Sequence, residues 1–170
     1  MKLNLIRPLV ILDIESTGVN PEIDRIIELS IMKIFSDGKE DIRTRRFNPQ
    51  IKIPESAIEI HGITDKDLVN EPAFSTLAKA INKYLEGCDI AYFGGNKFDV
   101  KILYFEFLRS GIEWDYQDSK LIDVGNIYKI REERSLTAAV KFYCGREHVG
   151  AHGAESDTKA TFDVLKSQLE

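Results

Sequence analysis

The sequence predicts an α/β fold with a mixed central sheet and helices on both faces. Residues 25–35 and 41–47 are β-type runs joined by Ser36-Asp37-Gly38-Lys39, a turn that makes the two strands antiparallel. Beyond residue 54, stretches with apolar residues at helical spacing alternate with short β-type runs. Strands that are interleaved with helices in this way are typical of a sheet that also contains parallel pairs.

The first predicted strand, residues 10–18, carries two carboxylates near its end. Positions two apart in a strand face the same side, so Asp13 and Glu15 project together while Leu12 and Ile14 face the opposite layer. Two such anions repel each other and lose hydration, which raises at least one pKa unless a cation lies between them. A hard divalent ion is the simplest such cation. The alternative is an edge strand with a hydrated face.

The remaining elements follow from turn and capping signals. A short helix over 54–62 should end at Gly62, and Thr64 to Asp67 form a capping box. The other predicted elements are a helix over 74–85, a strand over 88–93, a helix over 97–109 with Asn96 as N-cap, a loop or short strand over 112–119, helices over 121–131 and 135–143, and a helix from 154 to the C-terminus.

Length and composition predict one domain over residues 1–170 in a reducing cytoplasm. Such a chain buries about two-thirds of its unfolded surface. Cys88 and Cys144 form no CxxC pair, which argues against a zinc knuckle and against a secreted disulfide framework. Asp13 and Glu15 interrupt the first apolar run, so we expect neither a signal peptide nor a membrane span. A net charge of −5 argues against coating nucleic acid through bulk charge, but not against an enzyme whose bound metal ions reverse the local sign.

Four acids and one histidine occupy positions that a metal site could use. Asp13 and Glu15 end a strand, Asp99 begins a helix, Asp157 lies in the first turn of the last helix, and His152 precedes it in a glycine-flanked loop. Simpler explanations exist for three of them. The two helix-start acids favour the positive ends of their own helices, and the histidine is an ordinary loop residue.

A zinc site is the alternative use of the two histidines in this region. His148 and His152 have the spacing of ligands on one helical face. Gly150 and Gly153 disfavour a helix there, however, and no cysteine is near in the sequence. The sequence therefore argues against zinc.

Three motifs, in this order, resemble those of the DnaQ-like, or DEDDh, 3′ to 5′ exonucleases, a family with a ribonuclease H-like fold. Their segments are Asp13-Ile14-Glu15 with Thr17-Gly18, Asn96-Lys97-Phe98-Asp99, and His152-Gly153-Ala154-Glu155-Ser156-Asp157. Pro54-Glu55 and residues 60–65 also look like the wall of the terminal-nucleotide pocket in the proofreading members. The HGITD segment and the HGAxxD form of the third motif are similar to the epsilon-type proofreading exonucleases of bacterial DNA polymerase III.

The resemblance implies a metal-dependent exonuclease that releases nucleoside 5′-monophosphates from single-stranded or frayed DNA 3′ ends. Two Mg²⁺ or Mn²⁺ ions would be the cofactors, about 4 Å apart, with Asp13 bridging both. His152 would be the general base, a task that suits an imidazole. The implied metal ligands are Asp13, Glu15, Asp99 and Asp157, and the implied substrate-binding residues are Thr17, Gly18, Ile60, His61 and Phe98.

Several alternatives stay open at this point. Phe98 also fits the core face of a helix, and His61 also fits a helix end satisfied by backbone. The substrate is RNA or a short oligonucleotide in one alternative, and the chain is a non-catalytic nucleic-acid-binding module in another. The expected partner is a nucleic acid 3′ end, with DNA favoured over RNA and no membrane. Because Gln168-Leu169-Glu170 follow directly on the last helix, no polymerase or clamp partner is evident.

Overall fold

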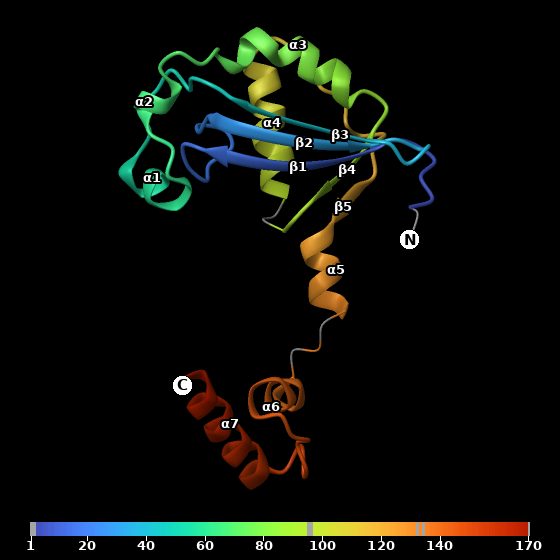
Figure 1. Cartoon of the computed structure of the whole chain (residues 1–170), viewed down its shortest axis with the longest axis vertical. Coiled ribbons are helices and arrows are strands. Elements are labelled where there is room, and N and C mark those ends of the chain that lie inside the picture. The colour runs from blue at the N-terminus through green and yellow to red at the C-terminus, as the bar shows by residue number, and fades with distance from the viewer. Residues whose placement is uncertain (1–2, 95–96, 132, 134, 170) are drawn as a thin grey trace. The chain divides into compact units, whose positions relative to one another are not determined.

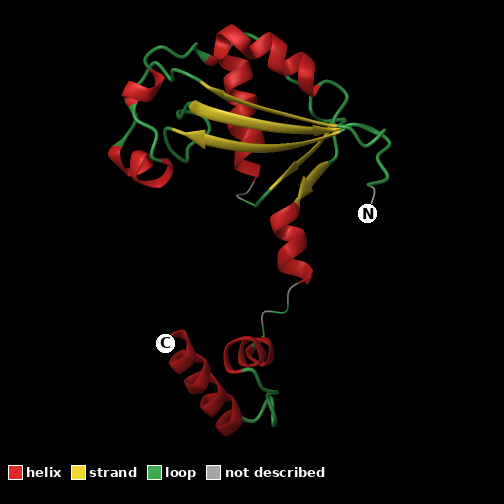
Figure 2. Ribbon diagram, in the orientation of Figure 1, coloured by secondary structure: helices red, strands yellow, loops and turns green. Residues whose placement is uncertain are grey.

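The computed structural model describes residues 3–94, 97–131, 133 and 135–169, and it contains two compact units, residues 1–126 and 127–170 (Figure 1). Figure 2 shows that the described strands lie in the first unit and that the described elements of the second are helices. Helix α5 (Val124–Arg131) crosses the boundary between them. One domain over residues 1–170 stays a prediction.

The first unit is built on a mixed sheet with the strand order β3-β2-β1-β4-β5. β1 pairs antiparallel with β2, and β2 with β3, whereas β1–β4 and β4–β5 are parallel. The predicted hairpin and the predicted mixed sheet are therefore confirmed. The strand bounds are β1 Leu9–Ser16, β2 Ile26–Ile34, β3 Glu40–Arg46, β4 Asp89–Tyr92 and β5 Leu121–Asp123.

Strand β1 alternates between core and surface as the sequence predicts. Leu12 and Ile14 are buried, Asp13 is exposed and Glu15 is half-buried. The pairing with β2 shifts between Glu15 and Ser16, which is a β-bulge or a similar irregularity. Bulges re-aim side chains and are common beside active sites. The two carboxylates thus lie on one face, next to a local bend of the strand.

Four described helices belong entirely to the first unit: α1 (Glu55–His61), α2 (Asp65–Leu68), α3 (Phe74–Leu85) and α4 (Phe98–Arg109). Gly62 ends α1 in the left-handed conformation, and the capping box of Thr64 and Asp67 is present, both as predicted. Buried residues of α3 and α4 share one hydrophobic cluster with β1, β2 and β4. Asn96, the predicted N-cap of α4, lies outside the described residues, and the N-cap is Lys97, with φ 64°.

The predicted helix over 121–131 is wrong for its first three residues. Leu121–Asp123 form strand β5, which pairs with β4 through Ile90 and Leu121. Asp123 then ends the strand, because its Oδ1 accepts hydrogen bonds from Gly94 N (3.0 Å) and Asn126 N (2.9 Å). A carboxylate that accepts from the first turn is an N-cap, so the helix begins one residue later, at Val124.

In the second unit, α6 (Leu136–Cys144) packs on α7 (Ala154–Gln168) around Val140, Ala160 and Val164. Ser135 caps α6 by accepting a hydrogen bond from Ala138 N, and Gly145 ends it with φ 64°, as predicted. Residues 148–153 belong to the loop between the two helices. Ser156 Oγ, near the start of α7, donates to Val149 O in this loop (2.7 Å). None of the described helices has the length and apolarity that crossing a bilayer requires.

Candidate active site

The loop that follows β1 is held in place by Thr17 and Asp24. Thr17 N donates to Arg25 O (2.9 Å), and Thr17 Oγ1 donates to Asp24 Oδ1 (2.9 Å) while it accepts from Arg25 N (3.0 Å). Asp24 Oδ2 also accepts from Asn20 N (2.8 Å). Thr17 is buried, and both its N–H and its hydroxyl are used within the protein. Thr17 therefore stabilises the loop, and its bonded N–H and hydroxyl groups have little capacity left for a ligand.

Gly18 lies against the Asp24 carboxylate so closely that a larger residue does not fit. A Cβ at Gly18 would lie 2.6 Å from Asp24 Oδ2 and 2.7 Å from Oδ1. Asp24 cannot easily move aside, because its hydrogen bonds from Thr17 and Asn20 fix it. The ThrGly pair of the first motif thus has a packing reason as well as the predicted functional one.

A cleft of about 320 Å³ opens at the end of β1, beside α1 and the start of α4. Figure 1 shows α1 near the end at which β1 terminates. All five predicted substrate-binding residues line this cleft, together with Glu15. Sequence reasoning missed Val19 and Ser56, which border it without belonging to any of the three motifs. The lining residues are Ile14, Glu15, Ser16, Thr17, Gly18, Val19, Ser56, Ala57, Ile60, His61 and Phe98.

His61 satisfies only half of its hydrogen-bonding capacity within the protein. Its Nδ1 accepts from Ile63 N (3.0 Å), which agrees with the simpler explanation of a helix-end residue. Its Nε2 is buried and has no hydrogen-bond partner among the described residues. Phe98 agrees both with the prediction of a core residue and with that of a substrate-binding residue, since it packs against the core cluster and also lines the cleft. A polar and an aromatic group are thereby presented to the same space.

Asp99, in the first turn of α4, lies close enough to β1 to be affected by its acids. Burial, together with the charges of Asp13 and Glu15, raises the pKa of Asp99 to about 6, against the opposing effect of the backbone N–H groups of Asp99 and Ile14. In the absence of a cation, this position stabilises the neutral form of the Asp99 carboxyl relative to that of an exposed aspartate. The structure thus places the first three of the predicted metal ligands, from two different elements, near enough for their charges to interact.

The pKa of Glu15 is also raised, first by burial and then by the charges of Asp13 and Glu28, while His61 acts in the opposite direction. Oxygen-only donors that repel one another suit a hard divalent cation such as Mg²⁺ or Mn²⁺. Among the described residues, no group of three or more His, Cys, Asp or Glu side chains is arranged tightly enough to hold a metal ion. These oxygen donors therefore suit a divalent metal, but the described residues do not by themselves form a complete metal site.

We expect the Asp99→Asn variant to be more stable than the wild type at pH 8 in EDTA. Because the folded pKa, about 6, lies above the ordinary 3.8, the stability that this carboxyl contributes is present below pH 3.8 and lost as the pH rises to 6. Asparagine carries no charge to desolvate, so the free energy of unfolding should rise by about 1 kcal/mol, a value reduced for partial solvent screening.

Urea unfolding at pH 8 and pH 4 measures this difference, which should shrink at the lower pH. Glu113→Gln, a change to an exposed carboxylate in the loop before β5, is the matched control and should show no such pH dependence. An Asp99→Asn protein that is no more stable than the wild type at pH 8 would contradict the crowding of acids at this position.

In the second unit, His152 stands at an unusual backbone position. Its φ is 71°, a left-handed conformation that side chains other than glycine rarely adopt, and its side chain is exposed in the turn after Gly150. Strained residues cluster at functional sites, where the surrounding structure maintains them. Asp157 lies five residues on, in the first turn of α7, with its N–H bonded to Gly153 O (2.8 Å).

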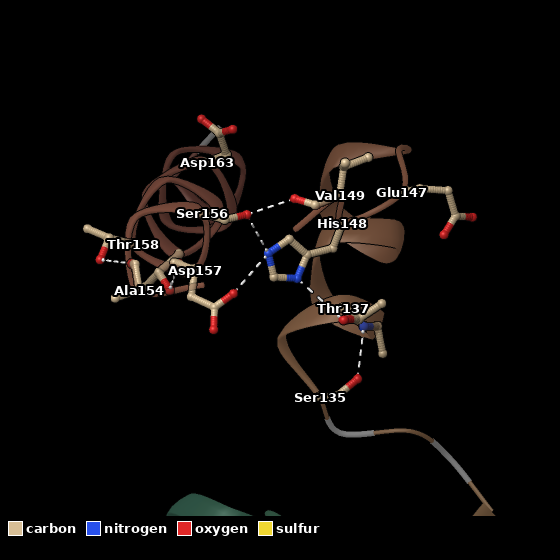
Figure 3. Close-up of polar contacts among 12 residues, drawn as sticks. Ser135, Thr137, Glu147, His148, Val149, Ala154, Ser156, Asp157, Thr158 and Asp163 are labelled. Carbon is tan, nitrogen blue, oxygen red and sulfur yellow. Dashed lines mark hydrogen bonds and ion pairs between the residues drawn. The ribbon is translucent and has the colours of Figure 1, made fainter. Parts of the chain in front are cut away.

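His148 is the residue of this region whose contacts the sequence did not predict. Its side chain is only 2% exposed, and its Nε2 lies 3.2 Å from Asp157 Oδ1 (Figure 3). The spacing of His148 and His152 suggested a pair of zinc ligands, whereas Gly150 and Gly153 argued against a zinc site. The structure instead places the buried imidazole beside the acid of the third motif.

Comparison with known proteins gives a family for this arrangement. A family model described as "Exonuclease" matches residues 10–165, which include all three motifs and most of each unit. The chain belongs to this exonuclease family. The DnaQ-like resemblance and the enzyme class that it implied are therefore confirmed.

Three relatives show the range of proteins in which this exonuclease domain occurs. The DNA polymerase III subunit epsilon of Buchnera aphidicola is 28% identical over 86% of this chain and 61% of its own length. The 3′-5′ exonuclease DinG of Bacillus subtilis is 26% identical, and the PolC-type DNA polymerase III of Thermotoga maritima is 30% identical, each over 95% of this chain. The chain spans only 17% and 12% of those two proteins.

Solved structures confirm the fold. E. coli exonuclease I in complex with a dT13 oligonucleotide has a TM-score of 0.64 to this chain, with 20% identity over 95% of this chain and 40% of that one. A zinc-bound form of the same enzyme with single-stranded DNA has a TM-score of 0.65, with 21% identity over 95% of this chain and 41% of that one. The mixed sheet with its helices is thus ribonuclease H-like, as the motifs predicted.

Proposed function

We propose that this chain is a metal-dependent 3′ to 5′ exonuclease that releases nucleoside 5′-monophosphates from single-stranded or frayed DNA ends. The observation that carries the proposal is the cleft at the end of β1, where Glu15 borders the same space as Gly18, His61 and Phe98. A cleft of about 320 Å³ is within the range of small-ligand sites, and a mononucleotide is a ligand of that class.

The terminal nucleotide would be held by groups of both polarities. Ile60 and Phe98 offer apolar contact to the last bases, and stacking of this kind tolerates any base. His61, which also lines the cleft, would bound the space for the last bases. Gly18 and Glu15 would contact the 3′ hydroxyl. Thr17, whose groups are already bonded, would shape the loop that presents Gly18.

Asp13, Glu15, Asp99 and Asp157 would hold two Mg²⁺ or Mn²⁺ ions, an assignment that rests on the motifs and on the raised pKa values of Glu15 and Asp99. Bound divalent ions supply charge neutralisation at the phosphate and a more acidic attacking water. An imidazole nitrogen of His152 would accept the proton of that water. The new P–O bond forms as the bond from phosphorus to the preceding O3′ breaks, and the departing O3′ takes up a proton from solvent water, so the shortened strand regains a 3′ hydroxyl.

The related proteins support a nucleic acid substrate and a divalent metal. One relative is named a 3′-5′ exonuclease, and solved structures of exonuclease I are described with dT13 and dA16 oligonucleotides and with zinc. DNA rather than RNA as substrate, Mg²⁺ or Mn²⁺ as the metal, and a cytoplasmic location stay predictions. An exoribonuclease of the same chemistry is the second candidate, and it is tested in the same assay.

The test is nucleotide release from a 5′-labelled single strand with Mg²⁺, Mn²⁺ or EDTA. We expect a ladder that shortens from the 3′ end with either metal, release of nucleoside 5′-monophosphates, and no cleavage in EDTA. A matched RNA strand should be degraded more slowly. Digestion from the 5′ end, or digestion that survives the chelator, would contradict the proposal.

A further inference from the structure

His148 lies in the segment that connects α6 to α7, and its imidazole is buried between the two helices. The side chain is 2% exposed, although the residue belongs to a loop. Its Nδ1 lies 3.3 Å from Thr137 Oγ1 on α6, and its Nε2 lies 3.4 Å from Ser156 Oγ on α7. A buried imidazole needs polar partners, and the structure supplies them on both sides of the ring (Figure 3).

The hydrogen bonds around Ser156 indicate which ring nitrogen carries the proton. Ser156 Oγ donates its single hydrogen to Val149 O (2.7 Å), so it can only accept from His148 Nε2. Nε2 must therefore carry a hydrogen, while Thr137 can donate to Nδ1. The N–H of Nε2 is thus directed to the start of α7.

Asp157 Oδ1 faces the same nitrogen. It lies 3.2 Å from His148 Nε2, within ion-pair distance, and it is buried without a regular hydrogen bond to any described residue, His148 included. The Asp157 side chain as a whole is 37% exposed, and Figure 3 shows its second carboxylate oxygen directed away from the imidazole. One oxygen is therefore turned inward to the ring and the other remains available.

We propose that His148 is a positioning residue that holds the Asp157 carboxylate in the orientation that binds metal. The inference rests on the proposed function, in which Asp157 is a metal ligand. A carboxylate in the first turn of a helix can adopt several rotamers, and the close approach of a buried ring nitrogen to one of its oxygens favours one of them. Groups that orient metal ligands in this way change metal affinity about 10- to 100-fold when they are removed.

A purely structural role for His148 predicts a different outcome. In that case the imidazole joins α6 to α7 through Thr137 and Ser156, and its loss lowers stability without a specific effect on metal binding. The two roles are separated by the Mn²⁺ affinity of the full chain without nucleic acid, measured by electron paramagnetic resonance of free Mn²⁺, together with the midpoint of thermal unfolding.

We expect His148→Ala to raise the Mn²⁺ dissociation constant about 10- to 100-fold. His148→Gln, which carries an amide N–H at about the distance of Nε2, should stay within a few-fold of the wild type. His148→Asn, whose amide reaches only about as far as Nδ1, should behave like the alanine variant. Val140→Ala, which removes apolar contacts from the same helix pair, should lower the thermal midpoint and leave the Mn²⁺ affinity unchanged.

Asp157→Asn separates a failure of this inference from a failure of the proposed function. If Asp157→Asn weakens Mn²⁺ binding and His148→Ala does not, the positioning role is wrong and the metal site stands. The positioning role is equally wrong if Val140→Ala weakens binding as much as His148→Ala does. If Asp157→Asn also binds Mn²⁺ like the wild type, Asp157 is not a ligand, and both the inference and this part of the proposed function are overturned.

Discussion

Replacing Asp13 by asparagine should reduce the rate of nucleotide release on the order of 10³-fold or more, the scale of losing a central catalytic group. In the proposed site Asp13 would be a ligand of the metal ions, and asparagine keeps the shape of the side chain but removes its charge. Asp13 is exposed on the face of β1 opposite to Leu12, so the substitution disturbs no core packing. The loss of rate should therefore come from chemistry and not from unfolding.

Two measurements check this interpretation of Asp13→Asn. Its thermal midpoint in EDTA should not fall, because the variant removes one of the charges that raise the pKa of Asp99. Asp115→Asn is the matched control, since Asp115 is an exposed loop acid whose Oδ1 accepts from Gln117 N, a bond that an amide oxygen can also accept. If Asp13→Asn released nucleotides at the wild-type rate, Asp13 on β1 would not be part of the catalytic site.

The second large effect is expected from His152. Losing a general base costs about 10²- to 10⁴-fold in rate, so His152→Ala and His152→Gly should both lose most of the turnover. The glycine variant is informative because φ at this position is 71°, which glycine adopts without strain and alanine does not. Equal losses in both variants would show that the imidazole, not the backbone, is needed.

Metal binding completes the test of His152. The Mn²⁺ affinity of His152→Gly should equal that of the wild type, because the proposal gives His152 no metal contact. An unaltered kcat in His152→Gly would refute the general-base role.

The sequence predicted those parts of the site that depend on local periodicity or on motifs. The alternation of Leu12, Asp13, Ile14 and Glu15 was sufficient to place two carboxylates on one face of β1, and burial confirms it. The predicted nucleotide-contact residues all line one cleft because the first motif and the 60–65 segment meet at the end of that strand. The alternation along β1 is decided by neighbouring residues, whereas the motifs identified the residues of the cleft without showing how the segments meet.

Other features depended on contacts between distant segments. β5 is only three residues long, and β4 rather than local propensity makes it a strand. The burial of His148 follows from Thr137 on α6 and Ser156 on α7, which a loop histidine cannot reveal in sequence. Asp24 belongs to none of the three motifs, yet it lies against Gly18, six residues before it in the chain.

The central claim is that one metal site takes ligands from the first motif and from the third. A crystal structure with Mn²⁺ and a nucleoside 5′-monophosphate, analysed by anomalous scattering, tests it most directly. We expect Mn²⁺ bound by carboxylate oxygens of both Asp13 and Asp157, with the nucleotide in the cleft lined by His61 and Phe98. Mn²⁺ that binds without either Asp13 or Asp157 would contradict the account.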